Sequence, residues 1–373
     1  MAEEGMARKV ALRVAAASTA VVLCLIAAWG GGVASSQGSP GPTLHGQTPM
    51  NTFKGPDQTP KGPNLHGQTL KVIAVGPDFD TVIVFHTEQI LQQWGAKVSQ
   101  IVVDTPTLAY AGLTTGQGDI TGVSPLGGLD AVQGGLPVKT FAIDGPRTDD
   151  VFVSKASITS MRQMKGATVG VLDLNSLNGI EVGLALGTGG LTTSDVNIVQ
   201  AGGQDVRVEA LAAGRLDAGP ISLQAYQTVL KPLGFHILFN YTTQAPGLIF
   251  DTLWATTSWL SKHTALAVAI AQAQLDSFRW FDDPKDKGAF IKLATSQLTG
   301  DTAAQASEVY DAYIAYKFYP EKAIFTKPLV TKNQQLFLKY NLISKPTPID
   351  QWVAFGIETK ALAAYNADAN NTG

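Results

Sequence analysis

Apolar and polar positions along the chain alternate in blocks that predict a series of strands and helices. From Leu70 onwards, short continuous apolar runs are separated by longer stretches in which apolar residues recur every three or four positions. The first kind of block is typical of a buried strand and the second of an amphipathic helix. Buried strands that alternate with helices indicate a mainly parallel sheet covered by helices. The pattern predicts strands over 71–76, 97–103 and 119–123 and helices over 81–94 and 106–115.

The same order of elements begins again at Ala167. Strands are predicted over 168–172 and 196–199, and helices over 176–186 and 205–213. Two similar α/β units in one chain predict two lobes, each with its own sheet.

Two segments are expected to cross between these lobes. The first has strands on either side of residues 144–147, and the second is a return crossing over 246–255. We therefore expect lobe 1 to comprise 70–145 plus 250–373, with lobe 2 over 146–249. Beyond the return crossing the pattern predicts helices over 264–281, 285–296, 302–318, 332–340 and 349–365.

The N-terminal region has the features of a targeting segment. Three basic residues precede an apolar run over 14–29, and small residues follow it. Residues 1–35 are therefore expected to be a signal peptide or an uncleaved signal anchor, and the body of the protein is expected to work outside the cytoplasmic membrane. Cys24 lies within the apolar run, where it does not fit a lipoprotein signal. Residues 36–69 are rich in Pro, Gly, Thr and Gln, which predicts a flexible linker.

A four-residue pattern occurs twice, 98 residues apart. In both copies, a leucine ends an apolar helix, a glycine follows as a helix stop, an aspartate opens a short strand and a serine stands at the strand's end. Ligands of α/β lobes bind outside the carboxyl ends of the strands, so the serines are expected to face one cleft. The matching residues are Leu113, Gly116, Asp119 and Ser124 in the first copy and Leu211, Gly214, Asp217 and Ser222 in the second.

Other polar residues stand at the same expected edge of the two sheets. Thr81, Asn175 and Ser176 can cap the helices that follow, which would point backbone N–H groups into the cleft. Such helix ends hold anionic or polar groups. Capping and turn formation alone also explain each of these residue types.

Composition and charge exclude several classes of function. The net charge of −3 and the absence of basic runs disfavour nucleic-acid binding. A single cysteine excludes an intrachain disulfide and leaves no thiol nucleophile in the folded body. His45 and His66 lack partners at ligand spacing, so no metal site is expected, and no cofactor motif is present.

Four stretches of the chain resemble the solute-binding proteins of ABC importers. They are residues 113–125, 134–138, 164–171 and 211–218, and the likeness extends over about 70–294. The most similar group binds nitrate, sulfonates, taurine and thiamine precursors. The resemblance implies an α/β fold of the two-lobed periplasmic-binding-protein type II, each lobe a mainly parallel sheet flanked by helices, with a helical C-terminal region.

The resemblance also implies that the ligand is clamped between the lobes. Asp78 and Asp80 stand where many relatives are small and neutral, which disfavours a strongly anionic ligand. Arg147 could compensate for this charge or pair with a neighbouring aspartate. The candidate ligand-binding residues are Phe79, Asp80, Thr81, Ser124, Pro125, Asp144, Arg147, Asn175, Ser176 and Ser222.

The expected function is that of a monomeric extracytoplasmic component that delivers a small polar organic or anionic solute to an ABC permease and its ATPase. No enzymatic activity is expected. Two alternatives remain open at the level of sequence. One is a ligand-sensing domain, and the other is an enzyme of the same fold, of the thiamine-pyrimidine or menaquinone biosynthesis type, or a hydrolase.

Overall fold

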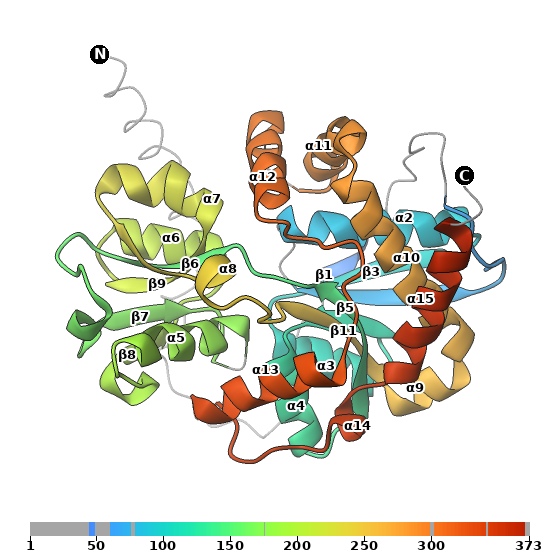
Figure 1. Ribbon diagram of the computed structural model, residues 1–373, viewed down its shortest axis with the longest axis horizontal. Coiled ribbons are helices and arrows are strands. Elements are labelled where there is room, and N and C mark those ends of the chain that lie inside the picture. Colours follow the sequence, from blue (N-terminus) through green and yellow to red (C-terminus); the bar gives the residue numbers. More distant parts are fainter. Residues whose placement is uncertain are drawn as a thin grey trace, which may run out of the picture. The chain divides into compact units, whose positions relative to one another are not determined.

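The computed structural model describes residues 45–48, 60–75, 79–174, 176–298, 302–340 and 342–369. Leu44–Gly373 form one compact unit, which contains two sheets (Figure 1). The targeting segment expected over 1–35 lies outside the described residues. No helix among those described is long and apolar enough to cross a membrane.

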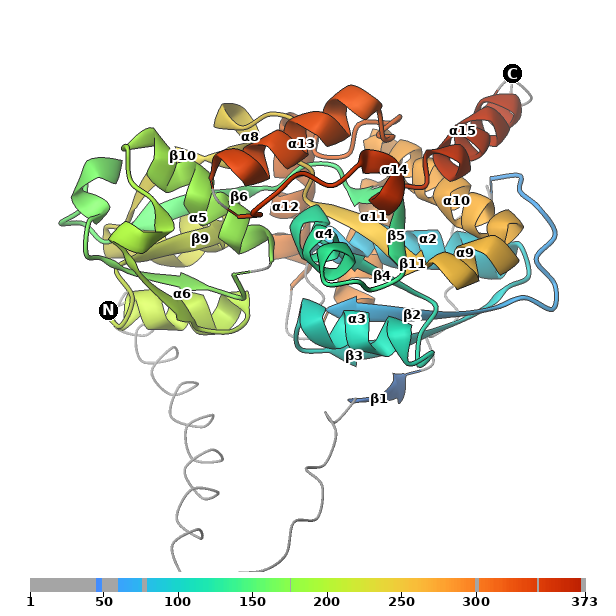
Figure 2. The same ribbon diagram turned by 90° about the horizontal axis from the view of Figure 1, so that it is seen from below.

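The first sheet has six strands in the order β1-β3-β2-β4-β11-β5. Four of them, β2 to β5, run in one direction, while β1 and β11 are antiparallel to their neighbours. β1 pairs with β3 at the edge of the sheet (Figure 2). The strands are β1 (His45–Thr48), β2 (Thr69–Val75), β3 (Lys97–Val103), β4 (Ile120–Val123), β5 (Val138–Gly145) and β11 (Asp251–Thr256).

The second sheet has five strands in the order β10-β6-β9-β7-β8, in which β6 alone is antiparallel to the others. Without β1, the two sheets share one topology. In each, the strand that arrives from the other sheet, β11 or β6, is inserted between the third and fourth strands. The predicted α/β fold with two mainly parallel sheets is confirmed. The strands are β6 (Asp150–Ser154), β7 (Thr168–Val171), β8 (Asn197–Gln200), β9 (Ala218–Ser222) and β10 (His236–Asn240).

Helices flank both sheets, and we call each sheet with its helices a lobe. The first lobe has α2 (Val82–Gln93), α3 (Pro106–Thr114) and α4 (Pro125–Gln133), preceded by a short turn, η2 (Phe79–Thr81). The second has α5 (Leu177–Thr188), α6 (Gln204–Ala212), α7 (Leu223–Ala225) and α8 (Tyr241–Gln244). The C-terminal region has α9 (Thr257–Lys262), α10 (Thr264–Asp282), α11 (Lys287–Gln297), α12 (Ala303–Ala315), α13 (Lys327–Lys339), α14 (Ile349–Trp352) and α15 (Phe355–Ala369).

The last helix differs from its sequence prediction. One helix was expected over 349–365, but the chain extends at Val353, which forms a bridge to Thr140 of β5. The N–H group of Ala354 donates to the carbonyl oxygen of Thr140 at 2.8 Å. These sheet contacts compete with the helical hydrogen bonds, so the segment divides into α14 and α15.

The two aspartates of the repeated pattern make the same contact in the two lobes. Asp119 Oδ2 accepts the N–H group of Lys71 at 2.8 Å, and Asp217 Oδ2 accepts that of Thr168 at 2.8 Å. Each carboxylate therefore ties the start of the third strand to the first strand of its sheet. The predicted role as strand-entry residues, at the edge away from the cleft, is confirmed.

The glycines and leucines of the pattern are structural as well. Gly116 and Gly214 follow α3 and α6 with φ of 75° and 71°, a left-handed conformation that favours glycine. Leu113 and Leu211 are buried in the cores beneath these helices. The predicted helix stops are confirmed.

We expect Asp119→Ala and Asp217→Ala each to lower the free energy of unfolding by about 1 kcal/mol, because each removes a hydrogen bond to a backbone N–H group. Urea denaturation measures this loss. Asp311→Ala, at an exposed ion pair with Lys287, is the control and should change stability less. Wild-type stability in both aspartate variants would contradict the shared role.

The folded part of the chain begins before Leu70. A flexible linker was expected over 36–69, but its last part packs against the first lobe. Trp94 Nε1 donates to the carbonyl oxygen of Pro60 at 2.7 Å, and Leu65 is buried. A Cβ atom on Gly62 would lie 2.0 Å from the ring of Trp94, so the segment passes directly over this indole. The side chain that orders the segment belongs to Trp94, the C-cap of α2, which composition alone could not indicate.

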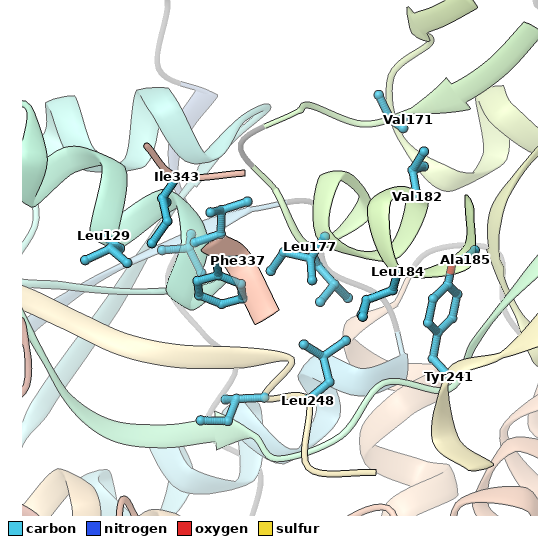
Figure 3. Close-up of a cluster of buried hydrophobic side chains, with 14 of the residues drawn as sticks. Leu129, Val171, Leu177, Val182, Leu184, Ala185, Tyr241, Leu248, Phe337 and Ile343 are labelled. Carbon is cyan, nitrogen blue, oxygen red and sulfur yellow. The ribbon is translucent and has the colours of Figure 1, made fainter. Parts of the chain in front are cut away.

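One hydrophobic cluster extends across both lobes. Phe337 of α13 and Ile343, which follows it, lie between Leu129 of α4 and Leu177 of α5 (Figure 3). Leu248 of the return crossing belongs to the same cluster. The C-terminal region therefore packs on the first lobe, the second lobe and the chain between them.

Helix α13 also holds the return crossing by hydrogen bonds. The side chain of Asn333 is fully buried, its Oδ1 accepts the N–H group of Ile249 at 3.0 Å, and its Nδ2 donates to the carbonyl oxygen of Gly247 at 2.9 Å. Lys332 Nζ donates to the carbonyl oxygen of Pro246 at 3.1 Å. The crossing is thus supported along several consecutive residues.

Candidate functional site

A cavity of about 270 Å³ lies where the carboxyl ends of strands from both lobes meet. The first lobe contributes Ser124 after β4 and Asp144 near the end of β5. The second contributes Ser222 at the end of β9 and Ser176 before α5. This is the position in which α/β lobes bind ligands.

Most residues predicted for the site line this cavity. Asn175 lies outside the described residues, so its prediction is not tested. The predicted residues in the cavity wall are Phe79, Asp80, Thr81, Ser124, Asp144, Ser176 and Ser222.

Two predicted residues have other positions. Pro125 is buried as the first residue of α4 and does not line the cavity. Arg147 Nη1 donates to the carbonyl oxygen of Tyr316, the C-cap of α12, at 2.8 Å. A basic side chain at a helix C-terminus satisfies one of its unpaired carbonyl groups. Arg147 therefore contacts the end of α12 and does not line the cavity, and its role in ligand binding stays a prediction.

The serines of the wall are helix N-caps. Ser222 Oγ accepts the N–H group of Ala225 at 3.2 Å, and Ser176 Oγ accepts that of Asn178 at 3.2 Å. Ser124 caps α4 with a longer contact, 3.5 Å, to Gly127. Ser124 and Ser222 have nearly the same backbone angles, φ/ψ of −59°/146° and −57°/145°. Capping thus explains why serine stands at both ends of the repeated pattern.

The wall contains a buried carboxyl group, that of Asp144, with an incomplete set of hydrogen bonds among the described residues. Asp144 is 5% exposed, and its Oδ1 has no hydrogen-bond partner in the part of the chain that the structure describes. Burial raises the pKa of Asp144 to about 8, hydrogen bonds from the backbone N–H groups of Asp144 and Gly145 to the carboxyl group lower it in part, and the charge of Asp80 raises it. Burial and the charge of Asp144 raise the pKa of Asp251, on the neighbouring strand β11, well above its usual range.

The carboxyl group of Asp144 lies over Gly122 of β4. A Cβ atom on Gly122 would be 2.3 Å from Asp144 Oδ2. Glycine is therefore required at this position for the carboxyl group to lie against the sheet.

The cavity continues from the cleft into the first lobe, beneath α2 and α10. Its walls there are mainly apolar, with Leu91, Ile120 and Ile270 among them. Glu88 is buried in this part, and its Oε1 accepts Gln100 Nε2 at 2.8 Å. Burial raises the pKa of Glu88 to about 8, although the hydrogen bond from Gln100 lowers it in part.

The wall in the second lobe contains a buried polar network. Glu181 lies behind it and accepts hydrogen bonds from Thr148 Oγ1 and Asn178 Nδ2, both at 3.0 Å. Burial raises the pKa of Glu181 and of Asp150, and for Asp150 the charge of Arg207 acts in the opposite direction. The network connects the start of β6, where the chain enters the lobe, to the first turn of α5.

Sequence reasoning missed several residues of the wall. Asp251 opens the return strand, and its place beside β5 carries it to the same edge as Asp144. Asp150 and Arg207 approach each other from β6 and α6. A strand-opening aspartate after a crossing was a usable signal for Asp251. The pattern of apolar and polar residues around Arg207 did not indicate that this side chain is buried.

The described residues contain no group of three or more His, Cys, Asp or Glu side chains arranged to hold a metal ion. His86 is stacked on Trp280, with ring centroids 3.7 Å apart, and its Nδ1 contacts Ser277 Oγ at 3.0 Å. The ring is part of the packing between α2 and α10.

Residues 87–273 match the family described as "ABC transporter, phosphonate, periplasmic substrate-binding protein". No curated protein matches the chain in sequence. Among solved structures, the chain is similar to the alkanesulfonate-binding protein SsuA from Xanthomonas axonopodis pv. citri bound to MOPS. The TM-score is 0.64 at 16% identity, over 78% of this chain and 99% of that one.

Two further structures share the fold. The periplasmic nitrate-binding protein NrtA from Synechocystis PCC 6803 has a TM-score of 0.66 at 11% identity, over 81% of this chain and 90% of that one. The desulfurization enzyme DSZB has a lower TM-score of 0.54 at 15% identity, over 80% of this chain and 99% of that one. At these identities the likeness concerns the fold alone.

Proposed function

This chain belongs to the phosphonate-binding family of periplasmic substrate-binding proteins of ABC transporters, and from that premise we propose that it captures a small polar solute between its two lobes for an ABC importer. Members of this family are extracytoplasmic proteins that work with a membrane permease and an ATPase. The observation that carries the proposal is the cavity of about 270 Å³, whose wall comes from both lobes.

The ligand-binding residues in this proposal come from the two lobes. A solute that touches both walls makes all of its contacts only when the lobes are closed, so binding favours the closed state. The proposed binding residues are Phe79, Asp80, Thr81, Ser124, Asp144, Ser176 and Ser222, with Asp251 and Asn178 added from the geometry of the wall.

We place the hinge at the two crossings between the sheets. The first runs from Gly145, the end of β5, to Asp150, the start of β6. The second is the segment before β11 that Asn333 holds. This division corresponds to lobes at 70–145 plus 250–373 and at 146–249. Rotation about a few residues at element ends is the usual mechanism of such closure.

Small-angle X-ray scattering tests the closure. A thermal-shift screen first identifies a stabilising solute among phosphonates, sulfonates, nitrate, amines and amino acids. Scattering with saturating amounts of that solute should then give a smaller radius of gyration than without it. An unchanged radius with a tightly bound solute would exclude the hinge mechanism.

We further propose that the protein works as a monomer, that residues 1–35 direct its export, and that it releases its solute unchanged. The last point separates it from an enzyme of the same fold. Nuclear magnetic resonance of the solute after long incubation with the protein should show the original compound alone. Any turnover product would favour the enzymatic alternative.

A further inference from the structure

The cavity is rich in carboxyl groups and poor in cationic ones. Of the described residues that line it, Arg207 is the single Lys or Arg, and its Nη1 donates to the carbonyl oxygen of Gly202 at 2.8 Å. When ionised, the carboxyl groups oppose a solute that carries only negative charge. The carboxyl-bearing residues of the wall are Asp80, Glu88, Asp104, Asp144, Asp149, Asp150 and Asp251.

Asp144, like Glu88 and Gln274, has a buried polar side-chain atom in this wall without a hydrogen-bond partner among the described residues. Its carboxyl group is removed from water, its Oδ1 has no hydrogen-bond partner among the described residues, and it lines the cavity. A buried polar atom that lacks a partner costs free energy, which a suitable ligand group recovers. Gly122 leaves the space in which this carboxyl group lies.

The positive charge of Arg207 does not compensate the carboxyl group of Asp144. It acts on Asp150, at the start of β6 in the second lobe. In the first lobe, the nearby charges are carboxylates, since Asp80 and Asp251 both interact electrostatically with Asp144. The first-lobe side of the cavity is therefore suited to a cation.

We propose that the cavity binds its solute through a protonated amino or amidino group, whose N–H donates to Asp144 Oδ1. This inference rests on the proposed function, since it names the solute chemistry of the same cleft. An N–H cation supplies both the missing hydrogen bond and the opposite charge, and such charge-assisted bonds are the strong ones. A quaternary ammonium group has no N–H and cannot supply the bond.

The rest of the solute is less restricted. The N-termini of α4 and α5 at the cavity rim are compatible with a partial negative charge, so the N–H cation can belong to a simple amine or to a zwitterion. Matched pairs of solutes that differ only in the amino group separate these cases. Suitable pairs are taurine with ethanesulfonate, 2-aminoethylphosphonate with ethylphosphonate, and benzamidine with benzamide.

Isothermal titration calorimetry on the wild-type protein is the first experiment. In at least one pair, we expect the cationic member to bind about tenfold tighter or more than its partner. Its binding should release protons, because Asp144 must ionise to pair with it, so affinity should rise from pH 6 to pH 8. Among the titratable groups near Asp144, which include Asp80, Asp251 and Tyr319, the charge of Asp80 makes its ionisation harder before the cation arrives, and Asp144 in turn adds to the effect of burial in raising the pKa of Asp251 and Tyr319.

Asp144→Asn removes the charge and keeps the size of the side chain. The preference for the cationic member should fall by about tenfold or more in this variant, while the affinity of the amine-free member stays the same or increases. Gly122→Ala should act in the same direction, because the added Cβ atom displaces the carboxyl group. Asp311→Asn, an exposed carboxylate outside the cavity, is the matched control and should leave every affinity unchanged.

Two results would overturn the inference. One is an amine-free oxyanion that binds as tightly as the cationic member of its pair and whose affinity rises towards acidic pH. That result would mean that protonated carboxyl groups hold an anion. The other is a preference for the amine that persists in Asp144→Asn. In both cases a solute is still captured, so the proposed function survives. Failure of every compound to bind, at millimolar concentration, would count against both.

Discussion

Replacing Trp254 by alanine is expected to lower the free energy of unfolding by about 3–5 kcal/mol, the range found for large buried aromatic side chains. Trp254 is fully buried on β11, between β4 and β5 of the first sheet. Its ring is stacked on Trp352 at a centroid distance of 6.2 Å and contacts Tyr110 edge-on at 6.0 Å. A cavity at this position would loosen β11, which carries Asp251 to the cleft. Chemical denaturation measures the loss.

A matched tryptophan and a double mutant serve as controls. Trp259, on α9, is half-buried, so Trp259→Ala should cost clearly less. A Cβ atom on Gly128 would lie 1.9 Å from the ring of Trp254. Gly128→Ala should therefore destabilise the wild-type protein and have little effect in the Trp254→Ala background. Additive effects of the two substitutions would contradict the packing described here.

Stability is expected to fall by about 5 kcal/mol between pH 6.5 and pH 8, because buried carboxyl groups hold protons that the unfolded chain releases. Burial raises the pKa of Glu88, Asp144 and Glu358 to about 8 in each case. For an acid whose folded-state pKa is raised, the stabilisation is complete below the unfolded-state pKa and is lost as the pH rises through the folded-state pKa. Thermal unfolding at a series of pH values measures the effect.

The window begins at pH 6.5 because His86 acts in the opposite direction below it. Burial lowers the pKa of His86 to about 3, so protonation in the unfolded chain costs stability as the pH falls below about 6.5. Glu88→Gln should make the decrease between pH 6.5 and pH 8 smaller by about 1–2 kcal/mol. Asp311→Asn, which is exposed, should leave it unchanged. A profile that rises over this window would contradict the buried protons.

Much of the fold was accessible from local pattern. The strand predicted over 97–103 has the bounds of β3, and the helices predicted over 81–94 and 106–115 correspond to α2 and α3. These elements combine one clear periodicity with a cap or glycine at each end, and the signals agree. The helix expected over 349–365 failed because Thr140, far away in the sequence, supplied a competing sheet contact.

The sequence predicted the location of the candidate site better than it predicted the chemistry of the residues there. The repeated serines indicated both walls of the cavity, since residues after parallel strands reach the same edge of a sheet. The direction of a long side chain could not be deduced in the same way, and Arg147 is directed to α12 instead of the cleft. The contact of Asp144 with Gly122 joins strands that are separated by β11.

The sequence by itself determined two repeated α/β units, their helix stops and caps, and the edge of the sheets at which the cavity lies. These depend on periodicity and on contacts between near neighbours, which local residue types specify. The tertiary structure decided that α13 spans both lobes, that Arg147 bonds to the end of α12, and that Asp144 is buried beside Asp251 with no hydrogen-bond partner for its Oδ1 among the described residues. Those outcomes depend on strand order and on packing between segments far apart in the chain, so they exist only in the folded molecule.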